Sequence, residues 1–376
     1  MTRPLSIVHT ENSCGWGGQE IRILTESRGL LDRGHRVQLL APPEAPIVEA
    51  ARRMGIPVET LALREKRLAD FLALRRWLGA NAAGIDILNT HSSTDSWLGA
   101  LACASLNDPP PIVRTRHVST PVHDRIGTRW LYRRGNAHIV TTGEAVKRQL
   151  VDGIGVPAEK MTSIPTGIDL ARFVPADPAT ARERLGLPPR LTLGIVATLR
   201  RWKGHAILFD ALAATRDAWT GWQLLVVGGG PDREELEEYV RGLGLADLVR
   251  FTGHQEDVVP WMQSLDLFVL PSYGDEGVPQ AIMQAMACAV PVISTPIGAI
   301  TEAVANGETG LLAQPRSAAS LAERLATLRD APALRSSFGA AARAKAEREF
   351  GIERMLDRME AVFRSVAERR GHRVDR

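Results

Sequence analysis

Short runs of apolar residues alternate along the chain with longer stretches whose apolar positions recur at helical spacing. The first run, Leu5–His9, is typical of a β-strand. The apolar residues between Ile21 and Leu31 then follow the spacing of a helix that Gly34 ends. Six more strand-like runs complete the first half: Val37–Ala41, Pro57–Leu61, Ile85–Thr90, Ile112–Arg116, Ala137–Thr141 and Met161–Pro165.

The same alternation restarts after a stretch that holds four prolines between residues 175 and 189. Strands that alternate with helices indicate parallel sheets covered by helices on both faces. The sequence therefore predicts two doubly wound α/β domains with a boundary near residues 166–190. A helical tail is predicted for Ala341–Ala367, followed by a polar, frayed end, ERRGHRVDR. The strand-like runs of the second half are Thr192–Ala197, Gln223–Val227, Val249–Thr252, Leu267–Leu270, Val292–Ser294 and Gly310–Ala313.

Length and composition agree with an ordered chain of two domains. A chain of 376 residues exceeds what one hydrophobic core usually holds. The 44% of hydrophobic and 24% of charged residues exclude disordered and collagen-like proteins. Three widely spaced cysteines without a C-x-x-C motif argue against a disulfide framework and a zinc site. The N-terminal segment reads as a strand and not a signal peptide, and no apolar stretch reaches the roughly 18 residues of a membrane span. We therefore expect a cytosolic protein.

Charge is unevenly divided between the two halves. Residues 1–165 contain 21 Lys and Arg against 16 Asp and Glu, a net charge of +5, whereas residues 166–376 carry −2. The total of +3 is too small to indicate a nucleic-acid-binding protein. The basic first half instead suggests an anionic surface or ligand there.

Two glycine-rich loops follow predicted strands. Both SCGWGGQE, at Ser13–Glu20, and VVGGGPDREELEE, at Val226–Glu238, allow backbone N–H groups at a helix start to approach an anion. Neither has the dinucleotide spacing, because Glu20 and Arg233 stand where the last glycine belongs, and the second loop lacks a P-loop ending. A plain tight turn remains an alternative for the first loop.

A basic turn directly follows the first strand of the second domain. In ATLRRWKGH, at Ala197–His205, the side chains of Arg200, Arg201 and Lys203 could neutralise a diphosphate. A solvated basic turn is the alternative, but the glycine-rich loops predicted nearby favour the diphosphate interpretation.

The segment Leu270–Thr295 combines a buried strand, a Gly/Pro-rich loop and a helix. Glu276 lies in the loop, where its carboxylate could accept hydrogen bonds from vicinal sugar hydroxyls while loop amides donate. Gln284 follows eight residues later in the helix and could reach a second polyol, such as a ribose.

With these motifs in order, the chain resembles the retaining family-4 glycosyltransferases of GT-B fold. The resemblance spans almost the whole chain, and its HTENSCGWGGQEIR opening is most similar to bacterial transferases that build lipopolysaccharide core or other surface glycans. The motifs that carry it are Gly17–Gly18, the RGH turn Arg33–His35, SIPTGIDLARF at Ser163–Phe173, Lys203–Gly204, VGGGPDREELE, VRFTGHQEDV at Val249–Val258, and the EG-x-P loop Glu276–Pro279.

The resemblance implies an α/β fold of two facing Rossmann-like domains with a cleft between them. An acceptor-binding domain would span residues 1–170, with a helix at about 355–376 packing back on it, and a nucleotide-sugar-binding domain would span residues 171–354. Catalytic roles fall on His117, Glu276, Lys203 and Arg200. Donor contacts fall on Gly17, Gly18, Gly229, Gly230, Pro231, Thr252, His254, Val258, Gly277, Val278, Pro279 and Gln284.

Three positions depart from the family pattern. Gln284 stands where glutamate is usual, Thr198 where an arginine is usual, and Thr166 where an asparagine is common. Glutamine can still bind ribose hydroxyls, and Arg200, with Arg201 second, could replace the missing arginine. The retained His117, Lys203 and Glu276 therefore suggest a subfamily and not an inactive protein.

The implied activity is transfer of a sugar, with retention, from a UDP- or GDP-linked donor to a cell-envelope glycan or lipid-linked acceptor. No cofactor is implied, and the absence of a D-x-D triplet agrees with a metal-independent reaction. A sugar phosphorylase, a nucleotide-sugar epimerase and a non-catalytic nucleotide-sugar-binding protein remain alternatives. A dehydrogenase is disfavoured by the failed dinucleotide spacings.

The acceptor region is expected in the basic first domain. His91 and Trp97, after a predicted strand, could line the acceptor site, although Trp97 could equally belong to the core. Leu63–Gly79 places Leu68, Phe71, Leu72 and Leu78 near five basic residues, and Arg125, Arg129, Arg133 and Arg134 interleave with Trp130 and Tyr132. Such helices could lie on an anionic membrane as a peripheral contact, or simply present a solvated basic face.

Overall fold

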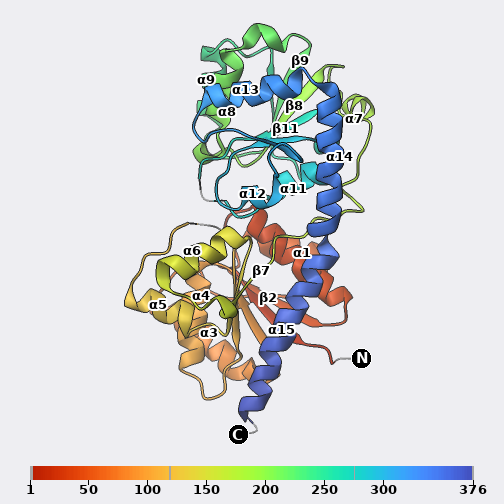
Figure 1. Ribbon diagram of the computed structural model, residues 1–376. Coiled ribbons are helices and arrows are strands. Elements are labelled where there is room, and N and C mark those ends of the chain that lie inside the picture. Colours follow the sequence, from red (N-terminus) through yellow and green to blue (C-terminus); the bar gives the residue numbers. More distant parts are fainter. Residues whose placement is uncertain (1–2, 118–119, 275, 375–376) are drawn as a thin grey trace. The chain divides into compact units, whose positions relative to one another are not determined.

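Neighbouring strands of the structure pair in parallel throughout, in two separate sheets. The computed structural model describes residues 3–117, 120–274 and 276–374. Contacts divide the chain into two units (Figure 1). The first unit combines Met1–Gly167 with Glu353–Arg376, and the second is Ile168–Ile352.

In the first unit, the described residues form a seven-stranded sheet in the order β3-β2-β1-β4-β5-β6-β7. The strands are β1 (Ser6–Thr10), β2 (Arg36–Ala41), β3 (Val58–Thr60), β4 (Ile87–Thr90), β5 (Ile112–Arg116), β6 (His138–Thr141) and β7 (Met161–Ser163). The helices are α1 (Gly18–Asp32), α2 (Pro46–Arg53), α3 (Leu68–Asn81), α4 (Ser93–Ala104), α5 (Ile126–Arg133), α6 (Glu144–Ile154) and the C-terminal α15 (Ile352–Val374).

Helices cover both faces of this sheet because successive strand residues point to opposite sides. Leu39 packs into a core with Ile23 of α1 and Ile47 of α2. Its neighbour Leu40 packs into a second core with Leu74 of α3. Residues 39–41 of this strand are therefore all apolar and buried, which is typical of a parallel sheet buried on both faces.

In the second unit, the described residues form a six-stranded sheet in the order β10-β9-β8-β11-β12-β13. The strands are β8 (Leu191–Val196), β9 (Trp222–Val227), β10 (Val249–Gly253), β11 (Leu267–Leu270), β12 (Val292–Ser294) and β13 (Gly310–Leu312). The helices are α7 (Pro178–Arg184), α8 (His205–Ala213), α9 (Arg233–Gly242), α10 (Val259–Gln263), α11 (Gln280–Ala287), α12 (Ile300–Ala303), α13 (Ala318–Arg329) and α14 (Pro332–Glu349). The fold class predicted from the sequence, two doubly wound α/β domains, is confirmed.

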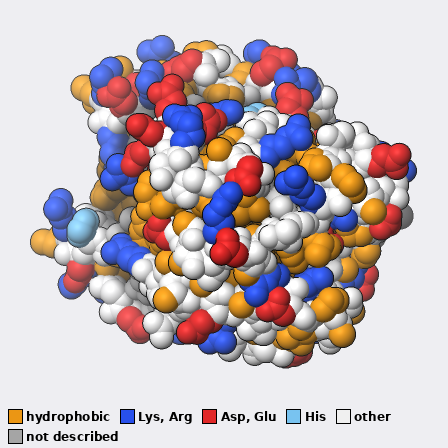
Figure 2. Space-filling model, turned by 90° about the horizontal axis from the view of Figure 1, so that it is seen from above, with side chains coloured by type: hydrophobic (Ala, Val, Ile, Leu, Met, Phe, Trp, Pro, Cys, Tyr) orange, Lys and Arg blue, Asp and Glu red, His pale blue; other side chains and the backbone are white. Residues whose placement is uncertain are grey.

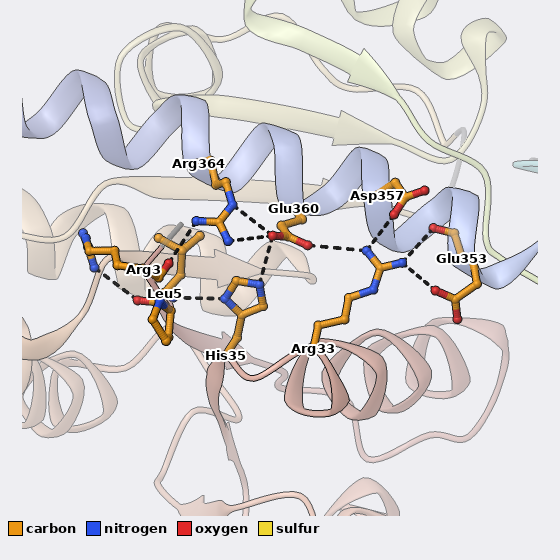
Figure 3. Close-up of polar contacts among 9 residues, drawn as sticks. Arg3, Leu5, Arg33, His35, Glu353, Asp357, Glu360 and Arg364 are labelled. Atoms are coloured by element: carbon orange, nitrogen blue, oxygen red, sulfur yellow. Dashed lines mark hydrogen bonds and ion pairs between the residues drawn. The ribbon is translucent and has the colours of Figure 1, made fainter. Parts of the chain in front are cut away.

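The RGH turn of the sequence holds the C-terminal helix against the first unit (Figure 3). The Arg33 guanidinium lies 2.6 Å from the Glu353 carboxylate and 2.8 Å from Asp357 of α15. His35 accepts a hydrogen bond from the Leu5 amide at Nδ1, and its Nε2 lies 3.3 Å from Glu360. One turn thus joins β1, α1 and α15.

The predicted single helical tail is wrong in two respects. The structure has two helices, because α14 ends at Glu349 and α15 begins at Ile352. Between them the Ile168 amide donates to Phe350 O, and the Ile352 amide donates to Ile168 O, so an extended segment takes backbone bonds that a continuous helix would use. Helix α15 also continues to Val374, past the frayed end that was predicted. Asp375 and Arg376 lie outside the described residues.

Charges of both signs share the surface. Lys and Arg side chains are interspersed with Asp and Glu over the face drawn in Figure 2, with hydrophobic side chains between them. Several charges pair locally in the second unit, such as Arg201 with Glu235 and Arg216 with Asp247. Within residues 3–117, 120–274 and 276–374, every helix is too short or too polar to cross a bilayer.

Because α1 packs closely against α15, we expect a Gly→Ala change in α1 to lower the stability of the protein, although alanine normally stabilises a helix. A Cβ at Gly29 would overlap the buried side chain of Leu356, so we expect Gly29→Ala to lower the free energy of unfolding by about 1–3 kcal/mol. Gly153→Ala in α6 is the matched control, because its Cβ would meet no atom. The control should gain roughly 0.5–1 kcal/mol from helix propensity alone. Urea-denaturation midpoints measure both variants, and equal stabilisation of the two would contradict this packing.

Candidate functional site

Each sheet contains one place where its strand order reverses. In the second unit, β8 is followed on one side by β9 and β10, and on the other side by β11. In the first unit, β1 has β2 on one side and β4 on the other. The loops that leave two such strands at their carboxyl ends diverge, and the crevice between them is where open α/β sheets bind ligands.

Lys203 and Glu276 meet at the reversal in the second unit. Lys203 comes from the turn after β8 and Glu276 from the loop after β11, and Nζ lies 2.6 Å from Oε1. The Ser272 hydroxyl donates to the same oxygen at 2.7 Å. Glu276 Oε2 accepts no hydrogen bond from the described residues, so the carboxylate is fixed at one oxygen and available at the other.

Backbone contacts hold the two loops together. The Tyr273 amide donates to Trp202 O at 2.8 Å. The Thr295 hydroxyl donates to Ser272 O from the loop after β12. The Lys203–Glu276 pair is therefore positioned by three neighbouring strand ends, and it does not rely on two flexible side chains alone.

The glycine-rich loop after β9 is enclosed by the loops of its neighbours. Gly228 has a φ of +143°, and a Cβ there would overlap Ala197 O. A Cβ at Gly230 would overlap the backbone of Leu199. The Leu199 amide donates to Gly229 O at 2.9 Å, and the Gly228 amide donates to Gly253 O at 2.9 Å. These glycines therefore have a packing role, whatever they bind.

The basic residues of the β8 loop differ in their partners. Arg201 pairs with Glu235 at 3.1 Å on the surface. Arg200 is exposed and lies over the Trp202 ring at 5.2 Å, and it forms no ion pair with a described residue. Of the two arginines, Arg200 is the one that a ligand could engage without breaking an ion pair.

The other donor residues predicted for the second unit lie at the ends of strands β9, β10 and β11 or follow them. Gly229 lies beside His254, which is exposed in the loop after β10. Gly277, Val278 and Pro279 are buried in the loop before α11. Gly230 and Pro231 are exposed after β9, whereas Thr252, Val258 and Gln284 are half-buried. Of the positions that depart from the family pattern, Thr198 is half-buried after β8 and Thr166 is buried in the first unit.

Three histidines form a chain at the strand-order reversal of the first unit. His9 of β1 and His91 after β4 approach with Nδ1 and Nε2 2.9 Å apart. His91 Nδ1 in turn lies 3.0 Å from Nε2 of His117, which follows β5. Both pairs of rings stack with centroids 5.2 Å apart. The chain brings together two residues that the sequence singled out, His91 and His117.

Hydrogen bonding gives the histidine chain a direction. Asn89 Oδ1 accepts from the Thr115 hydroxyl, so its amide nitrogen faces His9 Nδ1 and makes that nitrogen an acceptor. His91 then donates from Nε2, and His117 donates from Nε2 to His91. His117 Nδ1 keeps its lone pair.

The histidines are held neutral. Burial lowers the pKa of His9 to about 3, with the charge of Arg22 adding to the effect. Burial likewise holds the pKa values of His91 and His117 well below the usual range. In a chain of neutral imidazoles, the tautomer of one ring fixes the tautomer of the next. A charged imidazole would break this relation, because both of its nitrogens carry a proton.

A buried acidic pair, which the sequence did not predict, adjoins this chain. Glu11 accepts hydrogen bonds from the Ser92 hydroxyl and the Gln19 amide, and Asp95 accepts from the Thr10 hydroxyl and the His91 backbone N–H. Burial, and then the charge of Asp95, raises the pKa of Glu11 to about 7. Burial raises the pKa of Asp95 to about 6.

A cavity of about 760 Å³ opens beside the histidine chain within the first unit. His91, Trp97 and His117 all line it, which brings together the residues predicted for the acceptor and the reaction. Gly17 and Gly18 cap the start of α1, and the next residue, Gln19, lines the cavity. Residues that the sequence did not single out as ligands also line it: Lys66, Arg114, Arg116 and Tyr132.

Arg114 and Arg116 were missed because they sit in a strand that reads as core. Their signal was the polar alternation in IVRTR of β5, which places both side chains on one face. Within the part of the chain that the structure describes, no three His, Cys, Asp or Glu side chains converge as metal ligands would. A smaller cavity of about 370 Å³, between α7 and α10, holds none of the predicted site residues.

Two family models match the chain, one in each half. The model described as Glycosyltransferase Family 4 matches residues 16–172, and the one described as Glycosyl transferases group 1 matches residues 190–330. The lipopolysaccharide core biosynthesis mannosyltransferase LpsB of Rhizobium meliloti is 32% identical over 68% of this chain and 73% of its own. A D-inositol 3-phosphate glycosyltransferase of Geodermatophilus obscurus is 28% identical over 94% of this chain and 85% of its own.

A solved structure shares the fold over nearly the full length. The structure of HepE from Anabaena in complex with UDP covers 96% of this chain and 100% of its own, with a TM-score of 0.85 and 23% identity. At that identity the likeness concerns the architecture, which is the GT-B arrangement of two Rossmann-like domains expected from the sequence.

The raised pKa of Glu11 predicts that replacing this residue by glutamine stabilises the protein, and that the gain in stability depends on pH. Between pH 4.5 and about 7 the folded protein holds a proton on Glu11 that the unfolded chain has lost, so this residue makes stability fall as pH rises. Glu11→Gln removes that penalty. We expect the variant to exceed the wild type by about 1–3 kcal/mol in unfolding free energy at pH 8 and to match it near pH 4. Denaturation at several pH values measures the difference, and a gap that does not change with pH would contradict the assignment.

Proposed function

The chain belongs to glycosyltransferase family 4, and on this premise we propose that it transfers a sugar from a nucleoside-diphosphate sugar to a cell-envelope glycan or lipid-linked acceptor. The observation that carries the proposal is the meeting of Lys203 and Glu276 at the strand-order reversal of the second unit, 2.6 Å apart. The Lys203 ammonium suits the diphosphate of such a donor, and the Glu276 carboxylate suits the hydroxyls of its sugar.

In this proposal the donor diphosphate replaces Glu276 as the ionic partner of Lys203. Arg200 and the loop amides around Gly229 also bind the diphosphate. The released carboxylate, already anchored by Ser272, then accepts hydrogen bonds from sugar hydroxyls. Gln284 and the segment Thr252–Val258 would receive the ribose and base, with UDP or GDP as the nucleotide. The exchange is favourable because a multiply charged diphosphate interacts more strongly with the ammonium than one carboxylate does.

The reaction is proposed to retain the configuration of the sugar. As the C1–O bond breaks, negative charge grows on the leaving phosphate, where Lys203 and Arg200 stabilise it. The acceptor oxygen attacks from the same face, and the leaving phosphate oxygen takes the proton of the acceptor hydroxyl. His117 accepts a hydroxyl hydrogen bond at Nδ1 and so orients a reactant. We propose that no metal takes part, since the chain lacks a D-x-D triplet.

The acceptor is proposed to enter the 760 Å³ cavity of the first unit. His91 and His117 form its polar wall and Trp97 an aromatic one. The two relatives described above are named for a lipopolysaccharide core and for an inositol phosphate, both of which present several hydroxyl groups to a transferase. We propose a role in surface-glycan synthesis on the cytoplasmic side of the membrane, and the name of LpsB supports the surface-glycan part.

Donor binding should depend more on Lys203 than on the neighbouring arginine Arg201. For Lys203→Met we expect loss of the thermal stabilisation by UDP or GDP and a fall of at least about 100-fold in sugar transfer, because the leaving phosphate loses its main counter-charge. Arg201→Met is the matched control, since Arg201 is paired with Glu235, and it should change transfer only a few-fold.

A panel of nucleotide sugars, assayed with and without EDTA, gives the readout, and NMR of the product gives its anomeric configuration. Stabilisation by no nucleotide would overturn the donor site. An inverted product would overturn the retaining reaction.

Peripheral membrane contact is proposed for the rim of the cavity. Leu68 and Leu72 of α3 are 71% and 51% exposed, and Ile126 at the start of α5 is 90% exposed. Ile126 adjoins Arg125 and Gly127, which line the cavity. Phe71 and Leu78, by contrast, pack into the core. Exposed apolar side chains beside arginines suit an anionic bilayer surface.

Replacing all three exposed side chains by serine should reduce pelleting with phosphatidylglycerol vesicles several-fold, because the inserted apolar surface is lost. The matched control replaces Leu191 and Tyr239, exposed apolar residues of the second unit, and should leave pelleting unchanged. Equal pelleting of both variants and the wild type would count against the contact.

A further inference from the structure

Arg114 is a buried cation that forms no ion pair with any residue the structure describes. Its side chain rises from the middle of β5, is only 4% exposed, and lines the 760 Å³ cavity. The guanidinium lies over the Tyr132 ring, 4.4 Å from the centroid. Nε and Nη1 are buried without a hydrogen-bond partner, and among the described residues no carboxylate forms an ion pair with this group.

The carboxylate whose pKa Arg114 influences already has hydrogen-bond donors of its own. Asp95 feels the charge of Arg114, but its carboxylate accepts hydrogen bonds from the Thr10 hydroxyl and from backbone amides at His91, Ser92 and Ser96. No ion pair joins it to Arg114. Burying an unpaired charge costs several kcal/mol, so such a residue is expected where a ligand supplies the missing charge.

The other charged side chains of the cavity wall are also cations. Lys66 and Arg125 line it from the loops before α3 and α5, and neither forms an ion pair with a described residue. Burial and the neighbouring Arg114 lower the pKa of Lys66, as expected for two cations that face a common space. Among the described residues that line the cavity there is no Asp or Glu.

Neighbouring groups hold the basic wall in place. Arg116, two residues along β5, donates to the Tyr132 hydroxyl at 2.8 Å, so the ring that stacks on Arg114 is itself anchored. Ser92 and Ser93, at the start of α4, also line the cavity, and the Lys66 ammonium donates to the Ser93 hydroxyl at 3.3 Å. The guanidinium is therefore presented in a fixed orientation.

We propose that this cavity binds a phosphate group carried by the acceptor, with Arg114 as its principal ligand. The inference rests on the proposed transferase function and narrows the acceptor to a phosphorylated polyol. Phosphate fits better than a single carboxylate, because its double charge matches several cations and its three oxygens can accept the forked Arg donors and a lysine ammonium together. The hydroxyl that receives the sugar would then lie on the same molecule, beside His117.

The first experiment measures the thermal shift caused by inorganic phosphate at constant ionic strength, with chloride as the reference anion. The variants are Arg114→Met, Arg114→Lys and, as the matched control, Arg53→Gln, an exposed arginine of α2. Lys203→Met separates this cavity from the donor site, which could also take up phosphate.

We expect phosphate to raise the melting temperature of the wild type, Arg53→Gln and Lys203→Met. In the Lys203→Met background, where the donor site has lost its main phosphate ligand, Arg114→Met should abolish the rise and Arg114→Lys should reduce it. Without phosphate, Arg114→Met should melt no lower than the wild type, because the variant no longer buries an unpaired charge. A phosphate shift that survives Arg114→Met in the Lys203→Met background, or no shift in any variant, would overturn the proposal. A lower melting temperature without phosphate would assign Arg114 a structural role instead.

A second arm separates the sources of the phosphate. Mannose 6-phosphate tests a soluble sugar phosphate against mannose, and vesicles of phosphatidic acid in phosphatidylcholine test a lipid headgroup against phosphatidylcholine alone. Whichever probe binds should do so at least about tenfold more weakly to Arg114→Met, and binding of both probes that is indifferent to Arg114 would overturn the proposal. Stabilisation of Arg114→Met by UDP or GDP tests the transferase function independently, so either idea can fail without the other.

Discussion

The reversal of strand order in each sheet is the constraint on which the rest of the structure depends. The order of the parallel strands extends outward from one central strand in both directions. The loop after the central strand therefore meets the loop after a neighbouring strand that is far away in the sequence. In the second unit this places Lys203 against Glu276, 73 residues later. In the first unit it places His9 against His91, and the adjoining strand adds His117. Each unit therefore gains one polar crevice from topology alone.

The two crevices differ in character, and the difference matches a division of labour. The pair in the second unit is internally neutralised, so a charged ligand must exchange with one of its partners. The cavity of the first unit is lined by Lys66, Arg114 and Arg125, which form no ion pair with a described residue, and a neutral histidine chain lies at its side. Part of the positive charge of the first half of the sequence therefore faces this cavity.

Much of the fold followed from the sequence, because buried parallel strands are short apolar runs and their order along the chain is direct to read. The candidate site residues could also be predicted from the sequence, since open α/β sheets bind their ligands at the carboxyl ends of the strands. Contacts between side chains of non-consecutive strands did not follow. The Lys203–Glu276 pair, the Glu11–Asp95 pair and the exposure of Arg114 to a cavity all depend on which strands become neighbours. The break between α14 and α15 was missed for the same reason, because Ile168 causes it from a distant part of the chain.

The most direct test of the account is hydrogen–deuterium exchange of the intact chain with and without saturating UDP or GDP. We expect slower exchange in the loops after β8, β9, β10 and β11, covering the described residues of 198–204, 228–232, 252–258 and 272–279. Protection that is absent from these loops, or that is confined to the small cavity between α7 and α10, would contradict a donor site at the strand-order reversal.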